Sequence, residues 1–232
     1  MAPAAAHVFV DDPEDPVLGD DDRHHLERVL RLRVGEAVTA SDGRGRWRLC
    51  RYAGAGRLDP EDAVLIADRP EPPLTVAFAL TKGDRPEWTV QKLTEAGVDR
   101  IVPMVTARTV VRWEGGKSSR QVDRLRAVVR SAAMQSRRVW LPVVNDLQPF
   151  AAIAAELSAR AALAHAGGGP PTLARPATLV GPEGGWSPEE LGCGLPQVGL
   201  GPTILRSETA AMAAGLLLAA LRAGVVQPQG LP

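Results

Sequence analysis

A chain of 232 residues, 45% of them hydrophobic, is long enough for one large or two small domains with buried cores. We expect neither a secretory signal nor a membrane span, because no basic start precedes an apolar stretch and the apolar run 210–221 is too short. Cys50 and Cys193 are far apart and lack metal-ligand spacing, so we expect a reduced, cytoplasmic protein with no metal site.

The first 72 residues predict a small, mostly β domain. The expected elements are strands at 7–10, 34–40 and 46–52, a helix at 24–30 and a hairpin turn at 42–45. Asp20 or Asp22 is placed to cap the helix. The proline-rich stretch 67–73 is typical of a domain boundary, which predicts domains at 1–72 and 73–232.

The second domain shows strands alternating with helices. The expected strands are 74–80, 100–105, 161–165 and 178–180, and the expected helices are 87–96, 119–136 and 146–159. Asp146 is placed to cap the last of these helices, and 167–171 reads as a loose loop. This alternation predicts an α/β fold with a mainly parallel sheet.

A glycine-rich stretch at 178–190 is the feature around which the second domain is organised. Its apolar strand leads into Gly181, Gly184 and Gly185, and Ser187 then begins a helix with proline and acids in its first turn. Strand, glycine loop and helix in this order favour a ligand site, although a tight turn without a ligand has the same pattern. The spacing fits neither a Walker A loop nor a dinucleotide fingerprint.

A second strand and glycine loop follow at 197–205 and lead into a long apolar helix that reaches Leu221. Ser207 is a plausible N-cap for this helix. We expect the two glycine loops to lie side by side at the carboxyl edge of the sheet.

The net charge of +0 conceals basic zones. Residues 73–142 hold 13 basic and 6 acidic residues, and residues 23–57 hold 9 arginines against three acids. Such zones suit a polyanion partner. Arginines that are merely exposed to solvent explain the basic zones equally well. The chain has 24 arginines and 3 lysines, which also indicates a compositional bias.

Four ordered blocks resemble the ribosomal RNA small subunit methyltransferase E family of the SPOUT superfamily. They are Lys82–Arg85, Ala133–Arg137, Gly181–Ser187, and Leu200–Gly201 with Ile204–Ala210. His24-His25-Leu26 is similar to the start of the PUA-like domain of that family. The resemblance implies a SPOUT-type, mainly parallel sheet with a C-terminal trefoil knot, preceded by a small PUA-like β-barrel domain.

The resemblance also implies S-adenosylmethionine as methyl donor and uridine N3 of 16S ribosomal RNA as acceptor, in the small ribosomal subunit or a late precursor. The cofactor is expected on the two glycine loops, at Leu179, Val180, Gly181, Pro182, Glu183, Gly184, Gly185, Leu200, Gly201, Ile204, Leu205 and Arg206. Arg206 could stabilise charge on the base, Glu208 could take a proton or orient Arg206, and Gln135 could read the base edge.

The predicted RNA contacts are basic residues of the two zones: Arg23, Arg28, Arg31, Arg33, Lys82, Arg85, Arg108, Arg137 and Arg138. A homodimer is also implied, although the apolar helix 210–221 could instead be buried inside one chain. The alternatives are a SPOUT enzyme acting on ribose 2′-oxygen or on another RNA, and a non-catalytic RNA-binding protein in which both loops are structural.

Overall fold

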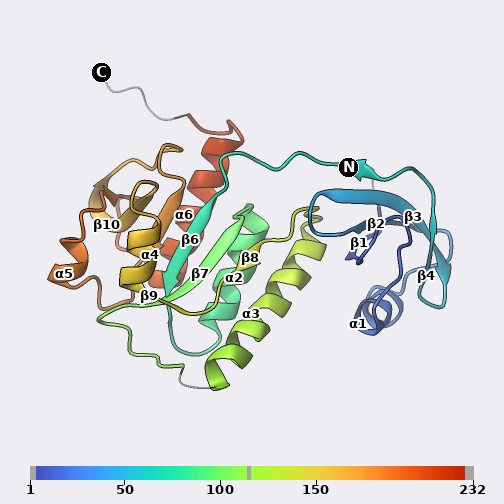
Figure 1. Ribbon diagram of the computed structural model, residues 1–232, viewed down its shortest axis with the longest axis horizontal. Coiled ribbons are helices and arrows are strands. Elements are labelled where there is room, and N and C mark those ends of the chain that lie inside the picture. The colour runs from blue at the N-terminus through green and yellow to red at the C-terminus, as the bar shows by residue number, and fades with distance from the viewer. Residues whose placement is uncertain (1–3, 114–115, 228–232) are drawn as a thin grey trace. The chain divides into compact units, whose positions relative to one another are not determined.

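The computed structural model describes residues 4–113 and 116–227, which form two compact units (Figure 1). The N-terminal unit comprises Met1–Arg69 and Arg130–Leu141, and the C-terminal unit comprises Pro70–Val129 and Pro142–Pro232. The chain therefore passes between the units three times, once inside a helix. The domain limits 1–72 and 73–232 stay a prediction, in which residues 130–141 belong to the second domain.

The N-terminal unit contains a five-stranded sheet of β1 (Ala6–Phe9), β2 (Ala37–Ser41), β3 (Arg46–Gly54), β4 (Arg57–Pro60) and β5 (Leu65–Ile66). β1 pairs with β2 in parallel, and β3 pairs antiparallel with β2, β4 and β5. The predicted strands and the hairpin between β2 and β3 are confirmed, whereas β4 and β5 were not predicted. Closure of this sheet into a barrel stays a prediction.

The helical turn of this unit begins earlier than the sequence suggested. α1 (Asp20–His24) continues into a π-helical turn, η1 (His25–Val29), and Gly19 is the N-cap without a side-chain cap. The prediction that Asp20 or Asp22 caps the helix is wrong, because both lie in its first turn. Asp22 is buried and pairs instead with Arg130 at 2.5 Å.

Packing and hydrogen bonds explain why residues 130–141 belong to this unit. Met134 packs against the core that includes Val8, Leu26 and Val38. His7 Nε2 lies 3.0 Å from the carbonyl oxygen of Arg138, and burial lowers the pKa of His7 to about 4. A neutral His7 therefore donates this bond.

The C-terminal unit is built on a seven-stranded sheet in which every pair is parallel. The strand order is β12-β10-β11-β6-β7-β8, and β9 also pairs with β7. The strands are β6 (Thr75–Ala79), β7 (Arg100–Val105), β8 (Val143–Val144), β9 (Gln148–Pro149), β10 (Ala161–Gly169), β11 (Ala177–Val180) and β12 (Gln197–Val198). The predicted mainly parallel α/β fold is confirmed.

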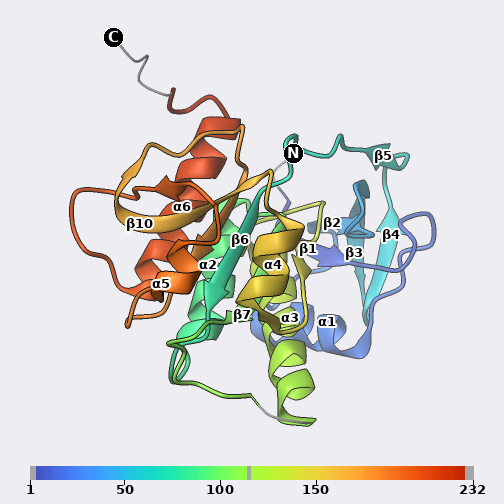
Figure 2. The ribbon, with the colours of Figure 1, turned by 60° about the vertical axis from the view of Figure 1, so that its left-hand side comes forward.

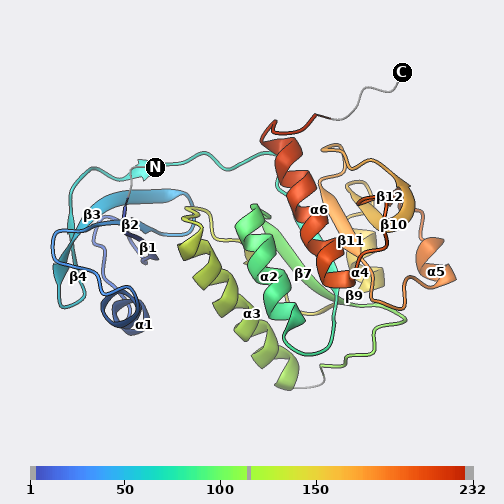
Figure 3. The ribbon, with the colours of Figure 1, turned by 180° about the vertical axis from the view of Figure 1, so that it is seen from behind.

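Helices cover both faces of this sheet. The helices are α2 (Arg85–Ala96), α3 (Gly116–Gln135), α4 (Phe150–Glu156), α5 (Pro188–Leu191) and α6 (Ser207–Arg222). α4 packs on one face (Figure 2), and α2 and α6 lie together on the other (Figure 3). α6 approaches α2 closely at Gly215, where a Cβ atom would lie 2.8 Å from the Leu93 side chain.

Three predictions for the C-terminal unit differ from the structure. α4 begins at Phe150, because Gln148 and Pro149 form β9, and Asp146 pairs with Arg126 instead of capping the helix. Residues 167–169 extend β10 and do not form a loop.

None of the helices in the ranges given above combines the length and the apolar character needed to cross a membrane.

Candidate functional site

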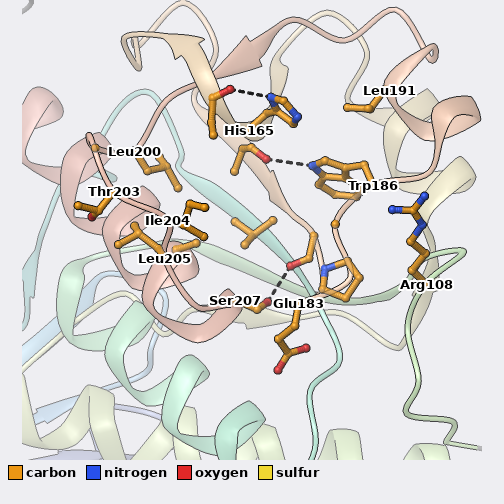
Figure 4. Close-up of a pocket in the computed structure, with 18 residues that line it drawn as sticks. Arg108, His165, Glu183, Trp186, Leu191, Leu200, Thr203, Ile204, Leu205 and Ser207 are labelled. Carbon is orange, nitrogen blue, oxygen red and sulfur yellow. Dashed lines mark hydrogen bonds between the residues drawn. The ribbon is translucent and has the colours of Figure 1, made fainter.

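A pocket of about 410 Å³ lies where β10 and the loops after β11 and β12 meet (Figure 4). The first glycine loop, residues 181–185, follows β11, and the second glycine loop, residues 199–206, follows β12. Both loops, residues 164–166 of β10 and the start of α6 line the pocket. Its lining is mainly backbone and apolar side chains, with few charges.

The first glycine loop turns sharply because of Gly185 and then enters α5. Gly185 has a φ of +69°, which glycine adopts without the strain that a side chain would bring. Ser187 caps α5 as predicted, and Glu190 completes the capping box by accepting from the Ser187 backbone N–H. A hydrogen bond from Ser187 lowers the pKa of the exposed Glu189.

The second glycine loop reaches the same pocket by a route that the sequence did not predict. β12 and β11 are not neighbours, because β10 lies between them in the sheet. The prediction that Ser207 caps α6 is wrong: Arg206 is the N-cap, with extended backbone. Ser207 Oγ instead donates a 2.8 Å hydrogen bond to the carbonyl oxygen of Gly181, which joins the two loops.

Two arginines also hold the first glycine loop. Arg108 Nη1 donates to the carbonyl oxygen of Gly184 at 2.9 Å, and Arg85 Nη1 donates to Glu183 at 2.7 Å. Arg85 Nε also lies 3.7 Å from Glu208 Oε1 on α6. The loop is therefore fixed from α2, from the turn after β7 and from α6.

The structure brings most of the predicted cofactor residues together. Those that line the pocket are Val180, Gly181, Pro182, Glu183, Gly185, Leu200, Gly201, Ile204 and Leu205. Leu179 is fully buried in the sheet core, and Gly184 lies under Arg108, with a φ outside the left-handed region. Arg206 is exposed and lies outside the lining.

None of the predicted catalytic residues lines the pocket. The side chain of Arg206 has no hydrogen-bond or ion-pair partner within the described part of the chain. Glu208 is largely buried, and its Oε2 atom has no hydrogen-bond partner there. Gln135 is exposed and belongs to the N-terminal unit, so the structure does not place it against the other two.

The predicted RNA contacts fall on both units. Arg28, Arg31 and Arg33 are exposed, and their side chains have no hydrogen-bond or ion-pair partner among residues 4–113 and 116–227. Arg23 pairs with Asp20 at 3.1 Å, and Arg137 donates to the Ala4 carbonyl oxygen. Lys82 is exposed and Arg138 is half-buried, whereas Arg85 and Arg108 support the first glycine loop.

Sequence reasoning missed several pocket residues, namely Ala164, His165, Ala166, Trp186, Leu191, Thr203, Ser207 and Ala210. His165 ends the predicted strand 161–165 and Ala166 follows it, so the rule that ligands bind at the carboxyl ends of parallel strands could have found them. Trp186 packs on Phe150 and donates from Nε1 to the Ala164 carbonyl oxygen at 2.9 Å, which closes one wall.

Comparison with known proteins assigns the class first. Residues 69–219 match the family model of an RNA methyltransferase domain, and residues 18–61 match that of an RNA methyltransferase PUA domain. The fold and the paired loops thus define an RNA methyltransferase of the SPOUT type.

The family follows from individual relatives. Ribosomal RNA small subunit methyltransferase E of Mycobacterium bovis is 36% identical, over 85% of this chain and 83% of that protein. The same protein of Bacillus subtilis is 29% identical, over 81% and 82%. The Neisseria gonorrhoeae protein of this name, solved bound to S-adenosylmethionine, is 28% identical with a TM-score of 0.73 over 93% and 97%. The chain belongs to the ribosomal RNA small subunit methyltransferase E family.

Proposed function

We propose that this ribosomal RNA methyltransferase transfers the methyl group of S-adenosylmethionine to N3 of a uridine in 16S ribosomal RNA. The observation that carries the proposal is the pocket formed by the two glycine loops at the edge of a parallel sheet. Family membership supports the reaction class, and the resemblance described at the start supplies the acceptor atom.

The residues of the pocket fit S-adenosylmethionine. Adenosine needs backbone donors and acceptors and an apolar wall, and the loops with Val180, Leu200 and Leu205 provide both. A Cβ atom at Gly185 or Gly201 would meet no other atom within 4 Å, so both glycines leave open space beside the pocket. When bound there, the cofactor supplies an electrophilic methyl group.

The acceptor side requires loss of a proton, because N3 of neutral uridine carries one. Arg206, exposed at the N-cap of α6, is free to bind the base oxygens and stabilise the charge that develops on them. Glu208 Oε2, without a hydrogen-bond partner in the described residues, suits an acceptor for the proton. Glu208 pairs with Arg85. This pairing gives no support to the alternative in which Glu208 orients Arg206. Gln135 remains the candidate for reading the base edge.

We propose that the RNA binds partly through three exposed arginines within and after η1, namely Arg28, Arg31 and Arg33. The partner would be 16S ribosomal RNA within the small subunit or a late precursor, which places the enzyme in the cytoplasm.

A homodimer is proposed from apolar side chains that one chain leaves exposed in the C-terminal unit. Ile204 is 94% exposed and Leu216 on α6 is 48% exposed. A dimer would cover such side chains, and sedimentation as a monomer at micromolar concentration would contradict it. The C-terminal trefoil knot also remains a prediction from the resemblance.

Two measurements separate the candidate functions. Isothermal titration should detect S-adenosylmethionine binding, and incubation with small subunits that lack the modification should yield N3-methyluridine on nucleoside analysis. Methylation of a ribose 2′-oxygen or of another RNA would assign the runner-up reaction. Absence of cofactor binding would leave a non-catalytic RNA-binding protein.

A further inference from the structure

We infer that Arg108 is a cofactor-specificity residue that binds the carboxylate of the methionine moiety of S-adenosylmethionine. The inference rests on the proposed function and refines it, because it assigns Arg108 to the cofactor and not to RNA. Arg108 lines the pocket, and Figure 4 shows its side chain at the pocket edge near Trp186.

Charge is the first argument. Arg108 is the one arginine or lysine among the residues that line the pocket, and no carboxylate pairs with it in the described part of the chain. Glu183, the acidic residue of the same lining, is already paired with Arg85 at 2.7 Å. Arg108 contributes to lowering the pKa of Glu189 but forms no ion pair with it. An arginine without an ion-pair partner at the edge of a mainly apolar pocket matches a ligand that carries a carboxylate.

The backbone of Arg108 is held in place before any ligand binds. It lies in a turn where Thr109 Oγ1 accepts from the Thr106 N–H at 2.9 Å. The buried side chain of Glu190 fixes the same turn by accepting from the Ala107 N–H at 2.8 Å. Because Glu190 also caps α5, the turn is attached to the helix that ends the first glycine loop.

The guanidinium of Arg108 keeps donors available for a ligand. Nη1 is used by the Gly184 carbonyl oxygen, whereas Nε and Nη2 have no partner among the described residues. One bond thus anchors the side chain over the loop, and the remaining N–H donors are available for a carboxylate. A phosphate of RNA has similar chemistry, but the anchoring to the cofactor loop favours the cofactor.

The test uses two ligands that differ by the carboxylate alone, S-adenosylmethionine and its decarboxylated analogue. The unaltered protein should bind the former about 10- to 100-fold more tightly in isothermal titration, as expected for a charge-assisted hydrogen bond. Arg108→Ala should abolish this preference by weakening S-adenosylmethionine binding alone. Arg112→Ala is the matched control, because it replaces another exposed arginine shortly after the same turn. This variant should keep the preference for S-adenosylmethionine.

Two outcomes would overturn the inference. Equal affinity of the unaltered protein for both ligands would show that the carboxylate is not recognised. An equal loss of affinity for both ligands in Arg108→Ala, with an unchanged melting temperature, would show that Arg108 only supports Gly184. If the unaltered protein bound neither ligand, the proposed function itself would fail.

Discussion

Ser207 Oγ donates a 2.8 Å hydrogen bond to the carbonyl oxygen of Gly181, and this bond joins α6 to the first glycine loop. Both residues line the pocket, although 26 positions separate them. The bond therefore fixes the distance between the two walls of the proposed cofactor site.

Ser207→Ala should weaken S-adenosylmethionine binding by roughly 3- to 10-fold, because the partly buried carbonyl oxygen of Gly181 loses its donor at a cost of about 1 kcal/mol. Isothermal titration measures the change. Ser158→Ala removes an exposed hydroxyl from the same unit and should have no effect. Equal affinities of Ser207→Ala and the unaltered protein would mean that the loop keeps its shape without the bond.

Gly185→Val should abolish cofactor binding while the protein remains folded. The φ of +69° makes a β-branched side chain cost about 1–3 kcal/mol, and that side chain would also enter the pocket. Gly184→Ala is the control, because its Cβ atom would meet Arg108 Cβ at an ordinary 3.4 Å. Titration and circular dichroism check both variants, and loss of binding in the control alone would contradict this prediction.

Arg31→Ala combined with Arg33→Ala should weaken RNA binding and lower the salt dependence of affinity by roughly one unit for each lost phosphate contact. Both side chains are exposed, and neither has a hydrogen-bond or ion-pair partner in the described ranges. Binding should be measured at several salt concentrations, and cofactor affinity should stay constant. An unchanged salt slope would remove these residues from the RNA-binding surface.

His7 should make the protein less stable as the pH falls from about 6.5 to about 4. Burial lowers its pKa from 6.5 to about 4, so the unfolded chain binds a proton in this range and the folded chain does not. The shift corresponds to about 3 kcal/mol of stability, present above pH 6.5 and lost progressively below it. Urea unfolding at several pH values measures it. The stability of the His7→Asn variant should decline less steeply as the pH falls. Parallel curves of stability against pH for the variant and the unaltered protein would contradict the assignment to His7.

Much of the fold follows from short-range signals in the sequence. The predicted helix 87–96 is observed as α2, with Pro86 in its first turn and Gly97 as its C-cap. The Ser187 cap was predictable because local hydrogen bonds satisfy the first turn of α5. Residues 167–169 escaped prediction because glycines are poor strand formers. They belong to β10 because Gly168 packs against the β12 backbone, where a Cβ atom would lie 2.5 Å from Val198.

The site was only partly predictable for a similar reason. The glycine loops were identified from composition, but the roles of Arg108 and Ser207 depend on the Gly184 and Gly181 carbonyl oxygens, which lie far from them in the sequence. Sequence spacing contains no information about such contacts. The sequence alone therefore predicted Arg85 and Arg108 as RNA contacts. In the structure, both side chains donate hydrogen bonds to the first glycine loop.

The position of α6 has a consequence for how the protein is made. The pocket draws on residues from Arg108 to Ala210, and α6 is the last helix that the structure describes. A ribosome releases the chain from its N-terminus, so β10 and β11 emerge before the residues that close the second wall. The proposed methyl-donor site of a nascent chain therefore stays incomplete until α6 has emerged, so donor binding would report that this helix is in place.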